Sequence, residues 1–173
     1  LKVTPLIEIH KELGAKLVPF AGWNMPIQFA GVLNEHNCVR KKVGLFDVSH
    51  MGEVEVEGSG AKDFLQYLLT NDLGKMFDGS ILYSLMCYEN GGVVDDLLVH
   101  RFSENHYFLC VNASNSDKDY QWIVKNSTSF DVNVKNISSE TSQLALQGPN
   151  AENVLQPLCD FSLNDLSYYN FKA

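Results

Sequence analysis

The chain has little of what marks several common protein classes. Its four cysteines, Cys38, Cys87, Cys110 and Cys159, form no C-x-x-C pair, so neither a zinc knuckle nor a redox pair is indicated and we expect no metal centre. No apolar run approaches the roughly 18 to 20 residues that a membrane span needs. The first residues also lack the basic and then apolar layout of a signal peptide. We therefore expect a soluble chain with no membrane partner.

Positive charge is scarce as well. The 13 lysines and arginines are outnumbered by 21 aspartates and glutamates, which gives a formal net charge of -8. Nucleic-acid binding relies on clustered Lys and Arg that neutralise phosphates, and the only basic run is Arg40-Lys41-Lys42. A solvated helix end explains that run better. The composition therefore predicts no nucleic-acid partner.

The first fifty residues show helical and extended patterns in turn. With 173 residues, 45% of them hydrophobic, the chain is long enough to build a core. Thr4 and Pro5 are typical of an N-cap and a first helical position, and apolar residues follow at helical spacing. Residues 16–20 look extended and residues 21–26 look like a loop. A second helix should follow, in which we expect His36 to be a half-buried packing residue on the face of Val32 and Val39.

Strict alternation begins at Gly52. Val54 and Val56 alternate with three glutamates, as in a half-buried strand whose acidic residues face water. We expect Ser59 to cap the next helix. Two apolar runs, 81–88 and 93–102, flank a Glu-Asn-Gly-Gly turn and predict a hairpin. A strand over 106–111, a helix opened by Ser116 and Asp119 as a capping box, and a strand over 130–134 complete the series.

This order of elements predicts the fold class. Strand, helix, three strands, helix and strand is close to a split βαβ, or ferredoxin-like, arrangement with one added hairpin strand. The chain should therefore be an α+β protein, with antiparallel sheets and flanking helices. Its last aromatic run, 168–171, begins a strand for which the pattern supplies no partner. A lone edge strand is unfavourable, so we expect a truncated chain.

Asp95 and Asp96 lie side by side inside the apolar run of the returning strand. A carboxylate in apolar surroundings has a raised pKa and is available as a base or as a partner for a transient cation. Alternation places Asp96 on one face with Val94, Leu98 and His100, and Asp95 on the other. Both faces look equally apolar, so periodicity does not choose between the two carboxylates. A surface dipeptide with a structural hydrogen bond is the alternative interpretation.

Five short segments, in this order and at these spacings, carry a specific resemblance. They are FAGWNMP at 20–26, GLFDVSHMGE at 44–53, GVVDDL at 92–97, VNASN at 111–115 and LQGP at 146–149. Together they resemble the amino-terminal half of the T-protein family of the glycine cleavage system, over about residues 4–171. The resemblance implies a tetrahydrofolate-dependent aminomethyltransferase of the cytoplasm, or of the mitochondrial matrix in a eukaryote. Its partner would be the lipoylated H-protein, and its co-substrate tetrahydrofolate.

The resemblance also implies roles for individual residues. Asp96 matches the catalytic aspartate of the family, which orients and activates the folate nitrogen. Tyr83 and Met51 match positions that line the folate pocket, and Asn112 matches one that can bond the pterin edge. A core tyrosine, a core methionine and a helix-capping asparagine are the respective alternatives. His100 stands where the family usually has a tyrosine, and it could keep a hydrogen bond in the pocket.

The resemblance further implies a domain organisation. Residues 48–136 would form an inserted ferredoxin-like domain, and residues 1–47 with 137–173 a discontinuous and incomplete first domain. Family members are about twice as long, and the residues that hold the anionic end of folate come from the other half. This chain has only two arginines, Arg40 and Arg101. We therefore expect it to be inactive alone.

Two other functions fit parts of the pattern. One is the folate-binding domain of a sarcosine- or dimethylglycine-oxidising enzyme, which shares the fold but resembles the segments at 20–26 and 44–53 less closely. The other is a non-catalytic folate-binding assembly factor. The retained Asp96 disfavours the second, because a binding module has no need of a carboxylate at the reacting nitrogen.

Overall fold

The computed structural model describes all residues from 1 to 173, and they form two compact units. Unit 1 comprises residues 1–50 and 142–165, and unit 2 comprises residues 51–141 and 166–173. The last eight residues join unit 2 because the Phe171 N–H donates to the Gly79 carbonyl and Asn170 bridges Ser80. The assignment of 1–47 with 137–173, and of 48–136, to two domains stays a prediction.

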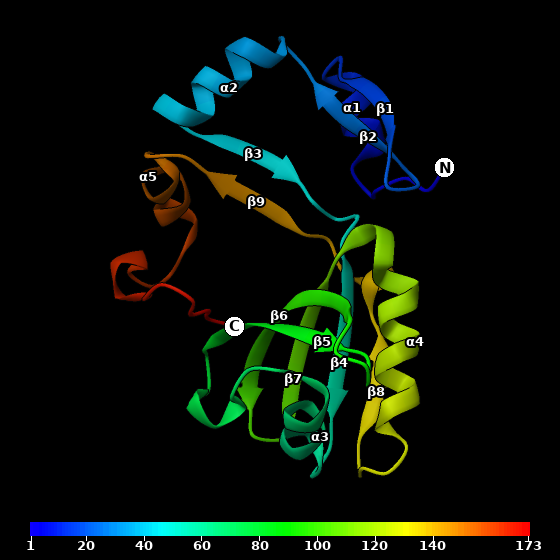
Figure 1. The fold of residues 1–173 in the computed structure, drawn as a ribbon. Coiled ribbons are helices and arrows are strands. Elements are labelled where there is room, and N and C mark those ends of the chain that lie inside the picture. Colours follow the sequence, from blue (N-terminus) through cyan, green and yellow to red (C-terminus); the bar gives the residue numbers. More distant parts are fainter. The chain divides into compact units, whose positions relative to one another are not determined.

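Unit 1 consists of short helices and two small antiparallel sheets (Figure 1). One sheet pairs β1 with β2, and the other pairs β3 with β9. The elements are α1 (Ile7–Glu12), β1 (Lys16–Phe20), β2 (Trp23–Gln28), α2 (Val32–Lys41), β3 (Gly44–Asp47), β9 (Leu144–Gln147) and α5 (Ala151–Leu155). The extended segment 16–20 and the second helix are thus confirmed.

The loop expected over residues 21–26 is wrong. The chain turns within two residues, Ala21 and Gly22, whose φ angles are 49° and 83°, and Trp23 already belongs to β2. Positive φ at both central residues gives the twist that a two-residue hairpin needs. The Trp-Asn-Met-Pro run that looked irregular is therefore a strand.

The cap expected of Thr4 is also wrong. Its side chain is buried and donates to Asp47 Oδ2 over 2.6 Å, and His10 Nε2 lies 2.8 Å from the same oxygen. Ser49 N–H donates to the other carboxylate oxygen over 3.0 Å. Burial alone would raise the pKa of Asp47, but these hydrogen bonds outweigh it and lower that pKa. The buried side of α1 therefore carries His10, while Ile9 remains 51% exposed.

Helix α2 differs from expectation at one position. None of its residues is buried, and His36 is exposed rather than half-buried.

The chain contains no helix that is both long enough and apolar enough to cross a lipid bilayer.

Unit 2 is built on one five-stranded antiparallel sheet (Figure 1). The strand order is β5-β6-β7-β4-β8. Its elements are β4 (Gly52–Glu57), α3 (Ala61–Leu68), β5 (Ile81–Cys87), β6 (Val93–Ser103), β7 (His106–Val111), α4 (Ser116–Ser127) and β8 (Asn133–Asn136). This confirms the α+β class and the split βαβ arrangement, with β5 as the added edge strand.

The core of unit 2 lies on one face of this sheet, beneath α3 and α4. Alternate residues of the central strands point into it, as the period of two requires. Its fully buried members include Val56, Phe64, Leu65, Val99, Tyr107, Leu109 and Ile123. The opposite face of the sheet is left to the more polar residues of the same strands.

Two capping predictions in unit 2 are wrong. Ser59 bonds Asp131 rather than the helix, and the N-cap position of α3 is Gly60. Asp119 does not close a capping box with Ser116, because its side chain is fully buried in the core.

Alternation predicted that Val94 and Asp96 share one face of the sheet, and this prediction is wrong. The pairing of β5 with β6 passes from Met86 and Asp95 directly to Cys87 and Val93, which leaves Val94 as the extra residue of a β-bulge. Val94 is 4% exposed and belongs to the core, and its carbonyl accepts from Lys118 Nζ over 2.6 Å. The bulge lies immediately before the aspartate pair.

Candidate active site

The register of the sheet divides the aspartate pair between its two faces. Asp95 lies opposite the fully buried Met86 and faces the helices, where it is 8% exposed. Asp96 lies opposite Leu85, and Tyr83 lies opposite Leu98, so Tyr83 and Asp96 share the helix-free face. The helices cover only the Asp95 side, so Asp96 is the carboxylate that remains on the open face.

Asp96 is held by two neighbouring side chains. The Asn112 amide nitrogen donates to Asp96 Oδ1 over 3.1 Å, and the Tyr83 hydroxyl donates to the same carboxylate. The hydrogen bond to Asp96 raises the pKa of Tyr83. Tyr83 is 46% exposed, which excludes the alternative of a core tyrosine. The arrangement presents a carboxylate and an aromatic ring together on an open surface.

Asn112 links the two aspartates. It directly follows β7, and its Nδ2 lies 3.1 Å from Asp95 Oδ1 as well as 3.1 Å from Asp96 Oδ1. The same nitrogen is 3.2 Å from the Asp96 carbonyl. Its side chain makes no capping bond to the following turn, so the alternative of a helix cap is wrong. An amide that donates to both carboxylates fixes them relative to each other.

Two further residues complete this cluster, and sequence reasoning missed both roles. Asn115 Nδ2 donates to Asp95 Oδ2 over 2.9 Å. The carboxyl of Asp119, which is 0% exposed, interacts with that of Asp95. The spacing of Asn112, Asn115 and Asp119, by three and then four residues, is the available signal, because it places polar groups on one side of a helical turn.

The two buried carboxyls differ in their affinity for a proton. Burial would raise the pKa of Asp95, but hydrogen bonds from Asp119, Asn115, Asn112 and a backbone N–H lower it below its usual value. Burial and the bond to the charged Asp95 raise the pKa of Asp119 to about 7. The pair therefore shares one proton, and that proton resides on Asp119.

His100 lies on the open face of the sheet, but neither His100 nor Met51 bonds to this cluster. His100 Nδ1 lies 3.3 Å from the Phe108 carbonyl, and its ring contacts those of Phe108 and Phe171 edge to face. Burial lowers the pKa of His100 and the bond to Phe108 opposes this only in part. His100 lies four positions along the strand from Asp96, which is about 13 Å at the usual rise per residue. Met51 is half-buried and precedes β4.

Glu53 is the glutamate of β4 that does not face water. It is 1% exposed, and neither of its carboxylate oxygens has a hydrogen-bond partner. The nearby Ser138 hydroxyl bonds the Glu53 backbone and the Asn136 side chain instead. The 3-10 turn over residues 138–140 packs against β4. Burial raises the pKa of Glu53 to about 7.

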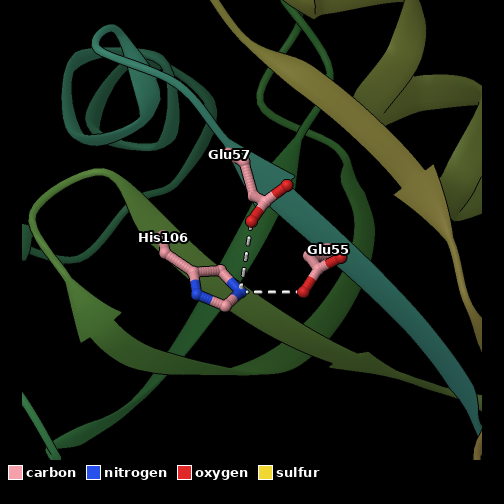
Figure 2. Close-up of side chains that lie close together, drawn as sticks. All are labelled: Glu55, Glu57 and His106. Carbon is pink, nitrogen blue, oxygen red and sulfur yellow. Dashed lines mark hydrogen bonds and ion pairs between the residues drawn. The ribbon is translucent and has the colours of Figure 1, made fainter.

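A second polar cluster lies farther along the same face of β4 and β7. Figure 2 shows the His106 ring directed at Glu55 and Glu57, with Nε2 at 2.8 and 4.0 Å from their oxygens. The three ligand atoms lie within 4.8 Å of one another, so this is the group that could hold a divalent cation. Glu57 is exposed, and such groups commonly pair at a surface without a metal. We assign the cluster no ligand.

Unit 1 contains a groove that none of the expected site residues lines. Its volume is about 520 Å³, and its walls include Ile27, Phe29, Val32 and Phe46. Two of its polar lining residues, His10 and Asp47, are already bonded to each other. The groove is mainly apolar, and the expected site residues all belong to unit 2 instead.

These features can be compared with known proteins. A family model described as the GCVT N-terminal domain matches residues 6–173. The chain belongs to this family. The predicted resemblance to the amino-terminal half of the T-protein of the glycine cleavage system is thereby confirmed.

Close relatives of this GCVT domain carry one name. A protein from Alkaliphilus metalliredigens named aminomethyltransferase is 54% identical over 168 residues, which are 97% of this chain and 46% of that protein. One from Desulfitobacterium hafniense is 55% identical over 172 residues, or 99% of this chain and 47% of that protein. The chain therefore spans about half the length of the curated relatives it matches.

Solved structures agree with the family. The glycine cleavage system aminomethyltransferase T of Bartonella henselae matches with a TM-score of 0.92 and 39% identity, over 98% of this chain and 46% of that one. The heterotetrameric sarcosine oxidase of Corynebacterium sp. U-96 matches with a TM-score of 0.52 and 15% identity, over 76% of this chain and 64% of that one. The second likeness shows a shared fold only.

The buried Glu53 predicts a pH dependence of stability. Its pKa is about 7 in the folded protein against an ordinary 4.5, so folding is favoured by the neutral form. That stability is fully present below about pH 4.5 and is lost as the pH rises through 7. Glu53→Gln stays neutral, so we expect it to exceed wild type by at least about 1 kcal/mol at pH 8 and to match it near pH 4.5.

Urea unfolding at the two pH values measures this difference. Glu57→Gln is the matched control, since Glu57 lies on the same strand but its side chain is 51% exposed. It should change the free energy of unfolding little at either pH. An equal effect of Glu53→Gln at pH 4.5 and pH 8 would contradict the assignment.

Proposed function

We propose that this chain is the amino-terminal part of a tetrahydrofolate-dependent aminomethyltransferase of the glycine cleavage system. The enzyme would take the methylene group from the aminomethyl-lipoyl arm of the H-protein, pass it to tetrahydrofolate and release ammonia. The observation that supports this most directly is Asp96, a carboxylate on the open face of the sheet that Asn112 and Tyr83 hold in place. The family and the names of its close relatives agree with it.

The chemistry requires a fixed negative charge. Loss of ammonia from an N–CH2–S centre breaks the C–N bond and leaves a sulfur-stabilised (thionium) cation. A carboxylate that is already oriented stabilises such a cation without further reorganisation. Asp96 would also orient the folate nitrogen that attacks the methylene carbon. Hydrogen bonds from Asn112 and Tyr83 restrict the carboxylate to one orientation, which keeps the reacting atoms aligned.

The surroundings of Asp96 suit a flat heterocycle. Tyr83 offers a partly exposed ring, which can pack against the pterin. The side chain of Asn112 uses only its nitrogen toward the aspartates, so its carbonyl oxygen can accept a hydrogen bond from the pterin edge. Met51 would contribute an adaptable apolar wall. Exclusion of water at this surface would prevent loss of the one-carbon unit as formaldehyde.

Two alternative functions have weaker support than the aminomethyltransferase function. The folate domain of a sarcosine-oxidising enzyme shares the fold, but the match to such an enzyme is only 15% identical, against 39% for the aminomethyltransferase of known structure. A non-catalytic assembly factor would need no carboxylate held at the pterin site. The observed bonding of Asp96 favours a reacting group.

We further propose that the 173-residue chain does not catalyse the transfer alone. Of its two arginines, Arg101 is bonded to Asp78 and to the Met76 carbonyl, so it is not available to an anionic folate tail. A mixture of the chain with tetrahydrofolate and aminomethyl-loaded H-protein should form no methylenetetrahydrofolate. Product above the rate without protein would contradict this expectation.

Replacement of Asp96 tests the proposed chemistry. In the complete open reading frame that encodes this chain, Asp96→Asn should lower kcat at least a hundredfold, because the amide keeps the shape and loses the charge. Tetrahydrofolate affinity, measured by isothermal titration calorimetry, should change less than threefold. Asp63→Asn, at an exposed position of α3, is the matched control. Undiminished turnover of Asp96→Asn would exclude the mechanism.

His100 provides a separate test of the pocket. His100→Tyr restores the usual residue of the family and replaces a group that contacts Phe108 and Phe171 but not Asp96. We expect tetrahydrofolate affinity of the complete protein to stay within threefold of wild type in a calorimetric titration. A tenfold loss would instead show that His100 contributes to binding directly.

A further inference from the structure

Asp119 is the most completely buried charged residue next to the site. It is 0% exposed, and no N–H group of the protein donates to either of its oxygens. Lys118 Nζ lies 3.6 Å from one oxygen, but it is directed at the Val94 carbonyl, 2.6 Å away. A buried carboxylate without donors is strongly disfavoured. Asp119 is therefore stable in this position as a neutral group with a proton to donate.

Asp95 is the acceptor for that proton. Asn112, Asn115 and the Asp96 backbone N–H already donate to Asp95, and it interacts with Asp119 as well. Four donors around one carboxylate are what a fully buried anion requires. One of the donors, Asn112, also holds Asp96. Asp119 thus interacts with Asp95, and the hydrogen bonds of Asn112 join Asp95 to Asp96, so the four side chains form one continuous series.

We propose that Asp119 is a positioning residue for the transfer reaction, whose carboxyl proton fixes Asp95 and thereby keeps the Asn112 amide between the two aspartates. This inference rests on the proposed function, because it assigns a purpose to the orientation of Asp96. Asp119 itself touches neither substrate nor reacting atoms. It acts through Asp95 and Asn112.

The arrangement has a pH limit. Loss of the Asp119 proton would place a second negative charge beside Asp95 and would remove one of its donors, so the two carboxylates would repel each other. The charged groups that act on Asp119 are Asp95 from β6 and Lys118 from α4 itself. The other elements packed on α4 contribute apolar side chains to the core there, among them Val54, Phe64 and Val134. Nothing else nearby compensates the added charge.

The pH dependence of kcat in wild type, Asp119→Asn and Asp119→Ala distinguishes a positioning role of Asp119 from a packing role. In the complete open reading frame, wild-type kcat should fall by about tenfold between pH 7 and pH 8.5 with a midpoint near 7, the value to which burial raises the pKa of Asp119. Asp119→Asn retains a donor at every pH, so its kcat should stay within threefold across this range. Asp119→Ala lacks the donor, so its kcat should be at least tenfold below that of Asp119→Asn at pH 6.5.

A measurement on the chain itself separates this proposal from the proposed function. In nuclear magnetic resonance spectra, the side-chain amide signals of Asn112 should shift with pH in step with the Asp119 carboxyl, and Asp119→Asn should abolish that shift. Asn126 is the internal control, since its amide donates to the Trp122 carbonyl on the same helix. It should not titrate.

These measurements test the positioning role of Asp119 and the aminomethyltransferase function separately. The positioning role would be overturned if the side-chain amide shifts of Asn112 did not change with the titration of Asp119. It would also be overturned if these shifts changed with pH in Asp119→Asn as they do in wild type. Coupled signals in a complete protein that lacks transfer activity would support the hydrogen-bonded series and refute the aminomethyltransferase function. A kcat of Asp119→Asn that falls with pH as wild type does would also refute the role of Asp119.

Discussion

The hydrogen bonds of the Asn112 side chain are the interaction on which the rest of the site depends. One amide nitrogen lies 3.1 Å from an oxygen of Asp95 and 3.1 Å from an oxygen of Asp96. Two carboxylates on adjacent residues repel each other, and without a shared donor they would turn apart. Asn112 can reach both because it follows the strand paired with β6 at the point where register places it beside Asp96. The fold therefore brings together groups that are 16 residues apart in the chain.

The sheet explains why adjacent aspartates differ in their surroundings. Helices α3 and α4 cover one face only, so Asp95 is enclosed while Asp96 stays accessible. The bulge at Val94 turns that residue into the core just before the pair, and bulges of this kind often re-aim side chains beside active sites. Environment rather than residue type thus distinguishes the two carboxylates, as it does in enzymes that use two carboxyl groups for different tasks. The enclosed carboxylate is structural, and the accessible one can meet a substrate.

Local patterns predicted the fold better than they predicted the site. Alternation and turn residues predicted most strands of unit 2, since Val54, Val56 and their neighbours pack against helices on one face only. They did not predict the bulge at Val94, and the strand expected over residues 130–134 begins only at Asn133. They failed where a side chain bonds a distant residue. Thr4 looked like a cap, yet it bonds Asp47, 43 residues away. Asp119 looked like half of a capping box, yet it faces Asp95. Periodicity describes which face is buried, and it carries no information about partners across that face.

The charge balance of the cluster follows from these contacts. If Asp95, Asp96 and Asp119 were all ionised, three negative charges would lie close together in space, with only Lys118 near them. Protonation of Asp119 removes one of these charges, and the donors around Asp95 stabilise the second. The charge on Asp96 is then the one that is left accessible, with Asn112 and Tyr83 as its donors. A cationic intermediate at this surface would therefore encounter one oriented charge, and the neutral, buried Asp119 would be a condition of that orientation.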